Sequence, residues 1–141
     1  CSNMWSKGGY NILLLLLFVM KLGSFSPIKP FTVFSGKWHA ETATASFDLN
    51  LTQIKGRVSG SHCAVQMGGQ KIDCAIKDND VTIIGNANNS TSVKVTFISQ
   101  FSQKKGTATI TKMNDSTLQW RIITKPKGEY YLPNQMVLSK Q

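Results

Sequence analysis

The residues with the clearest chemical meaning are two cysteines, Cys63 and Cys74, each five residues from a central Gly68-Gly69 pair. Gly-Gly suits the two central positions of a type I′ turn, because both need a positive φ. With this pair as the turn, the two cysteines face each other in a β-hairpin. A two-residue loop makes them a hydrogen-bonded pair with Cα atoms about 5.5 Å apart, which a disulfide tolerates. The spacing therefore predicts a Cys63–Cys74 disulfide.

Two other roles for the cysteine pair fit the sequence less well. Redox couples and zinc ligands commonly use a C-x-x-C spacing, which these cysteines lack, and only His62 lies close to them in the sequence. A structural bridge would stabilise the fold by about 2 to 3 kcal/mol and would persist in an oxidising compartment. The pair therefore indicates stability and compartment and does not indicate an activity.

His62 and Asp73, each next to one of these cysteines, are the best candidates for acid–base chemistry. Their diagonal offset in the predicted hairpin puts them on one face, where we expect a hydrogen-bonded surface pair. A catalytic dyad would need an activated nucleophile, and the nearest hydroxyl, Ser61, points to the opposite face. His39 is the only other histidine, and neither H-x-H nor H-E-x-x-H spacing occurs. We therefore predict no enzyme activity, no catalytic residue, no cofactor and no metal site.

The N-terminal segment is typical of a secretory signal peptide. It has a polar start, an apolar run of nine residues from Ile12 to Met20, and a small-x-small pattern at residues 24–26. The run is shorter than the about 20 residues that span a membrane. Pro27 directly after the pattern is unfavourable for a signal peptidase, so an uncleaved anchor is the alternative. We predict a leader at 1–26, one domain at 27–141, and a periplasmic or extracellular location.

The chain is basic, with 16 Lys and Arg against 7 Asp and Glu and a formal net charge of +9. Residues 1–26 contain two lysines and no acidic residue, so the remaining domain carries +7. Such a charge attracts lipopolysaccharide, phospholipid headgroups, acidic glycans or acidic proteins. Nucleic acid is not the predicted partner, because 14 of the basic residues are dispersed lysines without an arginine-rich run or a stacking motif. The alternative is that lysines at strand edges only discourage aggregation.

The period of the remaining chain is that of β-strands. Alternation is strict from Ala43 to Leu51, turn signals recur every 8 to 12 residues, and no stretch of ten residues has helical spacing. Gly60, inside a strand, indicates a bulge or a bend. Short connections favour a meander, and closure removes exposed edges. We therefore predict an all-β fold, an antiparallel up-and-down barrel of about eight strands. The expected strands are 34–38, 43–51, 57–67, 71–76, 81–85, 92–97, 107–111, 117–124 and 135–139.

The motif Gly36-Lys37-Trp38 at the start of the first strand, with Trp120 on a late strand, resembles the calycin superfamily of lipocalins, fatty-acid-binding proteins and avidins. The resemblance implies that Trp38 closes one end of the barrel and that Gly36 permits close packing. The lipocalin T-D-Y signature and the tryptophans of an avidin biotin site are absent, so biotin binding is not implied. Arg121 could act as the arginine that stacks on the first tryptophan of lipocalins, but alternation points it away from the face of Trp120.

Two functions are consistent with such a barrel. In the first, the barrel encloses a small apolar or amphipathic ligand, as calycins do, and its lining residues would be Trp38, Phe47, Leu49, Val95, Phe97, Ile110 and Trp120. Both tryptophans also fit a packed core. Side chains that fill the interior without a cavity would argue against this function.

In the second, the barrel is solid and binds a macromolecule, either as a protein- or glycan-binding envelope module such as a hydrolase inhibitor or by adhering to an anionic envelope component. Tyrosines beside lysines suit such an interface. The candidate contacts are Lys104, Lys105, Lys125, Lys127, Tyr130 and Tyr131. A charge distribution without clusters would weaken this second function.

Overall fold

The computed structural model describes residues 33–77, 79–88 and 90–141, so the predicted leader at 1–26 lies outside the described residues. The described chain forms one antiparallel sheet without an α-helix, and none of its helical turns is long and apolar enough to cross a membrane. The strands are β1 (Gly36–Glu41), β2 (Ser46–Ile54), β3 (Arg57–Gln66), β4 (Lys71–Cys74), β5 (Ile83–Asn86), β6 (Ser92–Ile98), β7 (Lys105–Asn114), β8 (Thr117–Thr124) and β9 (Gln135–Lys140).

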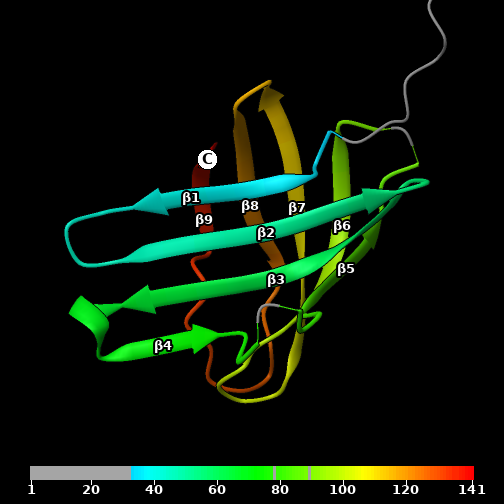
Figure 1. Ribbon diagram of the computed structural model, residues 1–141. Coiled ribbons are helices and arrows are strands. Elements are labelled where there is room, and N and C mark those ends of the chain that lie inside the picture. Colours follow the sequence, from blue (N-terminus) through cyan, green and yellow to red (C-terminus); the bar gives the residue numbers. More distant parts are fainter. Residues whose placement is uncertain (1–32, 78, 89) are drawn as a thin grey trace, which may run out of the picture.

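The sheet closes into a barrel of eight strands with β4 as an additional strand (Figure 1). Each barrel strand pairs with the next one along the chain, and β9 pairs with β1 to complete the circle. The first half of β3 pairs with β5, whereas its second half pairs with β4. The predicted all-β, up-and-down meander barrel is confirmed.

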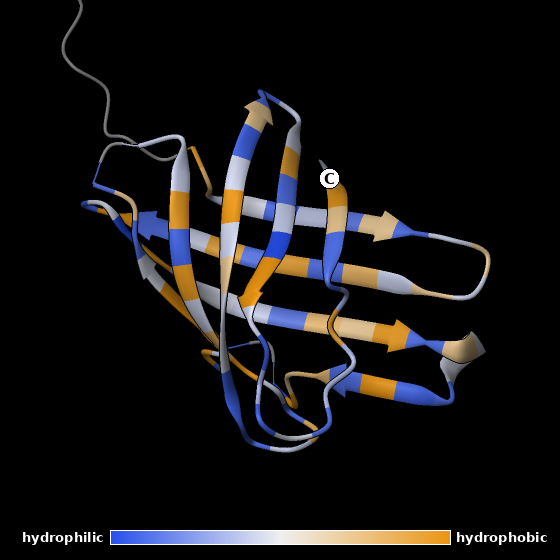
Figure 2. Ribbon diagram, turned by 180° about the vertical axis from the view of Figure 1, so that it is seen from behind, coloured by the Kyte–Doolittle hydropathy of each residue, from blue (hydrophilic) through white to orange (hydrophobic). Residues whose placement is uncertain are grey.

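Apolar side chains point inward at every second position, and hydrophobic and hydrophilic bands alternate along the strands in Figure 2. In β6, Val93, Val95 and Phe97 are buried, and the residues between them are exposed. Trp120 on β8 packs against Phe47 and Phe97, with ring centroids 5.2 and 5.4 Å apart. The period of two in the sequence therefore becomes one continuous core.

The turn between β2 and β3 moves the second strand three residues beyond its predicted end, from Leu51 to Ile54. Lys55 and Gly56 both have a positive φ, 50° and 82°, as a type I′ turn requires. At Gly60 the β2–β3 register runs without a shift, so of the two predicted alternatives, a bulge or a bend, the bulge is absent. A Cβ at this glycine would lie 1.9 Å from the backbone oxygen of Asn50, so glycine permits the close approach of the two strands.

The cysteine hairpin has the predicted register but a wider loop. Cys63 faces Cys74 and the disulfide is formed, yet the last pair before the loop is Gln66 with Lys71, so the predicted two-residue turn is wrong. Gly68 N–H donates to Thr44 O in the β1–β2 connection (2.9 Å), a tertiary bond that a local turn rule does not consider. Because the loop is wider by one residue on each side, hydrogen-bonded and non-hydrogen-bonded pairs exchange places along the hairpin, and the cysteines form a non-hydrogen-bonded pair. Their Cα atoms are 3.9 Å apart, closer than the about 5.5 Å of a hydrogen-bonded pair.

Candidate functional site

The side chains predicted to line an internal ligand site are packed in the core. A side chain beside a cavity wide enough for a ligand would be accessible to water from within, but all seven are only 0–1% exposed: Trp38, Phe47, Leu49, Val95, Phe97, Ile110 and Trp120. The Trp38 indole N–H donates to Phe34 O (3.1 Å), and the Trp120 indole N–H donates to Pro133 O (2.8 Å). These residues therefore contact other protein atoms on all sides.

The four predicted contact lysines come together at one end of the barrel. Lys104 and Lys105 lie where the β6–β7 connection enters β7, and Lys125 and Lys127 lie in the β8–β9 connection, which runs beside it in Figures 1 and 2. Gly128 packs so closely that a Cβ on it would be 2.9 Å from the Lys104 Cγ. All four lysines are exposed, and none forms an ion pair with a carboxylate of the described chain. We call these four residues the basic loop surface.

The two predicted contact tyrosines have different surroundings. Tyr131 is buried, and its ring packs edge-on against the half-exposed Phe101, with centroids 4.8 Å apart. The Lys71 ammonium lies 5.3 Å from the centre of the Tyr131 ring. Tyr130 instead lines a separate groove of about 500 Å³, where its hydroxyl donates to Asn134 (2.9 Å). The structure therefore adds Phe101 and Lys71 to the neighbourhood of Tyr131 and places Tyr130 elsewhere.

A buried carboxylate joins the connections that carry the lysines. Asp73 Oδ2 accepts hydrogen bonds from the Ser99 hydroxyl (2.6 Å) and the Tyr131 N–H (3.1 Å). Its Oδ1 accepts from the Gln100 N–H (2.7 Å) and from His62 Nε2–H (2.9 Å). Burial alone would raise the pKa of Asp73, but these four donors together hold its pKa below the ordinary value. Asp73 is therefore ionised and ties β4 to the β6–β7 and β8–β9 connections.

The hydrogen bond predicted between His62 and Asp73 is confirmed, but the predicted surface position is wrong, because both side chains are fully buried. They face inward from β3 and β4, and the β6–β7 and β8–β9 connections cover them. His62 Nδ1 lies 2.7 Å from Thr82 Oγ1, so both ring nitrogens have partners. A hydroxyl, an imidazole and a carboxylate thus form a chain as in a nucleophilic triad. Thr82 is only 3% exposed, so a substrate would not reach its hydroxyl.

A second histidine–aspartate pair lies on the outer face of β1 and β2. His39 Nδ1 and Asp48 Oδ1 are 2.5 Å apart, and Glu41 lies 3.6 Å from the other ring nitrogen. The hydrogen bond to Asp48 and the two negative charges raise the pKa of His39 above its ordinary value, although partial burial acts in the opposite direction. Within the described ranges, no three His, Cys, Asp or Glu residues are grouped as metal ligands.

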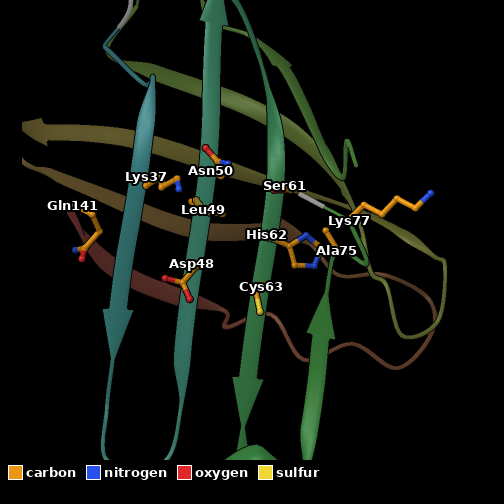
Figure 3. A pocket seen from close by; sticks show the side chains of 10 residues that line it. All are labelled: Lys37, Asp48, Leu49, Asn50, Ser61, His62, Cys63, Ala75, Lys77 and Gln141. Carbon is orange, nitrogen blue, oxygen red and sulfur yellow. The ribbon is translucent and has the colours of Figure 1, made fainter. Parts of the chain in front are cut away.

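A polar groove of about 280 Å³ runs across β1, β2 and β3 beside this exposed pair. Figure 3 shows Lys37 next to Asn50 over β1 and β2, whereas Lys77 points away from the His62 ring. Asp48 also lines the groove, so its lining carries both signs of charge. This groove therefore selects a ligand by charge less clearly than the basic loop surface does.

Two partners of the buried pair, Thr82 and Ser99, were not predicted from the sequence. The sequence contained a signal for the burial of Ser99, since this polar residue lies two positions after Phe97 and continues the inward-facing series of β6. His62 had the same signal, two residues before the inward-facing Ala64. Thr82 had no such signal, because it precedes its strand and its neighbour Ile83 is also buried.

These observations describe a small disulfide-bonded antiparallel barrel with a packed core and a basic surface at one end. Comparisons of the chain with protein-family models, curated proteins and solved structures find no significant match. The calycin resemblance therefore stays a prediction, and a function is argued from the side chains alone.

Proposed function

We propose that this protein is an exported, non-enzymatic β-barrel that binds an anionic envelope component through the basic loop surface. The observation that carries this proposal is the convergence of four exposed lysines on two connections that Asp73 holds together. Because no carboxylate of the described chain pairs with these lysines, their charge is available to a partner. The exposed ring of Phe101 adds an apolar contact beside them.

Electrostatics supports an anionic partner. The chain has a formal net charge of +9, which favours encounter with negative surfaces at low salt. Exposed charges are screened over about 8 Å at physiological ionic strength, so binding through this surface weakens as salt is added. The leader predicted from the sequence and the Cys63–Cys74 disulfide both agree with export.

The packed interior favours binding at the surface over binding of an enclosed ligand. The seven predicted lining side chains are all buried in one contiguous core, so a ligand could enter only if some of them separated. Burial also supports a non-enzymatic role, because the only chain of hydroxyl, imidazole and carboxylate found in the described residues is closed to substrate.

The test compares two variants with equal net charge. The variant K104Q/K105Q/K125Q/K127Q removes the basic loop surface, and K37Q/K55Q/K77Q/K94Q removes four exposed lysines elsewhere, so each lowers the formal charge from +9 to +5. Binding is measured by cosedimentation with phosphatidylglycerol vesicles and by retention on immobilised heparin. Since a lysine near an anionic surface contributes about 1 kcal/mol, we expect the first variant to bind at least about tenfold more weakly to one of these probes. The control variant should lose less than about threefold. Equal losses, or no binding by the unaltered protein, would overturn the proposal.

A further inference from the structure

An apolar groove adjoins the basic loop surface on the outer face of β5 and β6. Its volume is about 280 Å³, and its lining residues are Val81, Thr82, Ile84, Thr96, Ile98 and Lys105. Ile98 and Lys105 face each other across β6 and β7, so the lysine stands directly beside the groove. The groove and the basic loop surface therefore share this residue.

Two apolar residues of this groove, Val81 and Ile84, face outward from the barrel. Ile83 points into the core, and alternation would place a polar residue at the next, outward position, which Ile84 occupies. Val81 is 51% exposed and Ile84 is 44% exposed, so both lose the free energy that burial would provide. Exposed apolar residues that stand singly need no explanation, but Val81 and Ile84 line one groove next to a charged surface, and an apolar patch with a polar rim marks a binding site.

We propose that this groove holds an acyl chain of an anionic lipid whose headgroup binds Lys105 and the rest of the basic loop surface. The inference depends on the proposed function, because the headgroup site is the same surface. The groove offers a lipid two kinds of contact: apolar side chains, and the side chain of Lys105, which lines the same groove and forms no ion pair with a described carboxylate. An acidic glycan would satisfy the lysines and leave Val81 and Ile84 unused, because it carries no apolar chain. A single-chain anionic lipid makes both kinds of contact.

The test distinguishes binding of the acyl chain from binding of the headgroup. The full-length protein, recovered from an exporting host, is titrated with monomeric dodecyl phosphate and, separately, with inorganic phosphate, and affinities are measured by calorimetry. We expect dodecyl phosphate to bind at least tenfold more tightly than phosphate. V81T/I84T keeps β-branched side chains but removes apolar groups, and it should lower the dodecyl phosphate affinity at least fivefold.

The matched control is I54T/V137T, which changes one isoleucine and one valine that are also exposed but lie on other strands. It should retain the dodecyl phosphate affinity within twofold. T96W is a second test, because an indole at this exposed position occupies the groove while Lys105 is retained. It should lower dodecyl phosphate affinity as V81T/I84T does and leave phosphate binding unchanged.

The outcomes distinguish this inference from the proposed function. If the unaltered protein binds heparin or phosphatidylglycerol vesicles through its four lysines while V81T/I84T and T96W bind dodecyl phosphate normally, the acyl-chain site is wrong and the basic surface stands. Binding to heparin without binding to dodecyl phosphate would also overturn the lipid and favour a glycan. If the lysine variant binds every anionic probe as the unaltered protein does, the proposed function itself fails.

Discussion

The two histidine–aspartate pairs of this protein lie on opposite faces of the sheet that contains the disulfide. His62 and Asp73 face the interior, whereas Asp48 faces outward and is the cross-strand neighbour of Cys63. The buried pair has a hydrogen-bond partner for each ring nitrogen and four donors to its carboxylate. The exposed pair of His39 and Asp48 has Glu41 as its only further ionic neighbour among the described residues.

The environment of a histidine–aspartate pair therefore decides what the pair contributes. In the interior, an ionised carboxylate is tolerated only when hydrogen bonds replace its lost hydration, so Asp73 fixes the positions of every donor around it. At the surface, water competes with the partner and the pair contributes little to stability. The buried pair therefore organises the fold, and the exposed pair responds to pH.

Removing the buried carboxylate should destabilise the protein more than any other change considered below. D73A leaves His62 and the Ser99, Gln100 and Tyr131 donors without an acceptor. We expect the free energy of unfolding in urea, followed by tryptophan fluorescence, to fall by about 3 to 5 kcal/mol. D73N should also be strongly destabilised, because its amide N–H₂ would face donors.

The matched control is D48A, which removes the carboxylate of the exposed pair and should cost no more than about 1 kcal/mol. If D73A and D48A were equally destabilised, the four hydrogen bonds of Asp73 would not have the structural role assigned to them. If D73A does not fold in the exporting host, the comparison is made between D73N and D48N.

The disulfide connects the two environments, and its removal should have the second largest effect. β4 is four residues long and, within the described sheet, pairs only with β3, so the Cys63–Cys74 bridge holds the strand that carries Asp73. C63S/C74S should lose about 2 to 3 kcal/mol of stability. Hydrogen exchange should also become faster in residues 71–74 than in β7, because β4 loses its covalent link.

Two controls accompany this variant. Adding dithiothreitol to the unaltered protein should reproduce the loss of stability, and adding it to C63S/C74S should change nothing. A double variant as stable as the unaltered protein would show that the hydrogen bonds of Asp73 suffice to hold β4.

The sequence predicted the parts of this architecture that depend on local periodicity. Alternation placed Phe47, Leu49 and Val95 in the core, and equal distance from the glycine pair placed Cys63 opposite Cys74. These predictions succeed because a period of two can be recognised in the sequence without knowing which strands become neighbours.

The failures have a common physical cause in tertiary contacts. The wider hairpin loop depends on the hydrogen bond from Gly68 to Thr44, and the burial of Asp73 depends on connections that arrive from distant parts of the chain. The convergence of the lysines requires the packing of Gly128 on Lys104, which no spacing in the sequence indicates. Only the polar residues at inward positions, His62 and Ser99, could have indicated a buried network.

A change at the exposed pair of His39 and Asp48 should alter the free energy of unfolding least, and its effect should depend on pH. Because the folded state raises the pKa of His39, protonated His39 favours folding. This contribution is fully present below the ordinary histidine pKa of about 6.5 and is lost as the pH rises through the higher folded pKa. The difference in unfolding free energy between the unaltered protein and H39Q should therefore be below about 1 kcal/mol near pH 6 and vanish towards pH 9.

The buried pair does not produce this trend through Asp73, because the pKa of that carboxyl is lowered and its contribution is lost only as the pH falls into the acid range. D48N should weaken the pH dependence of the difference between H39Q and the unaltered protein, since it leaves only a neutral acceptor for the hydrogen bond that contributes most to the raised pKa of His39. A difference between H39Q and the unaltered protein that grew with pH would reverse the sign of this linkage. It would mean that His39 is held neutral in the folded state, as burial would require, and that its surroundings resemble those of an interior histidine.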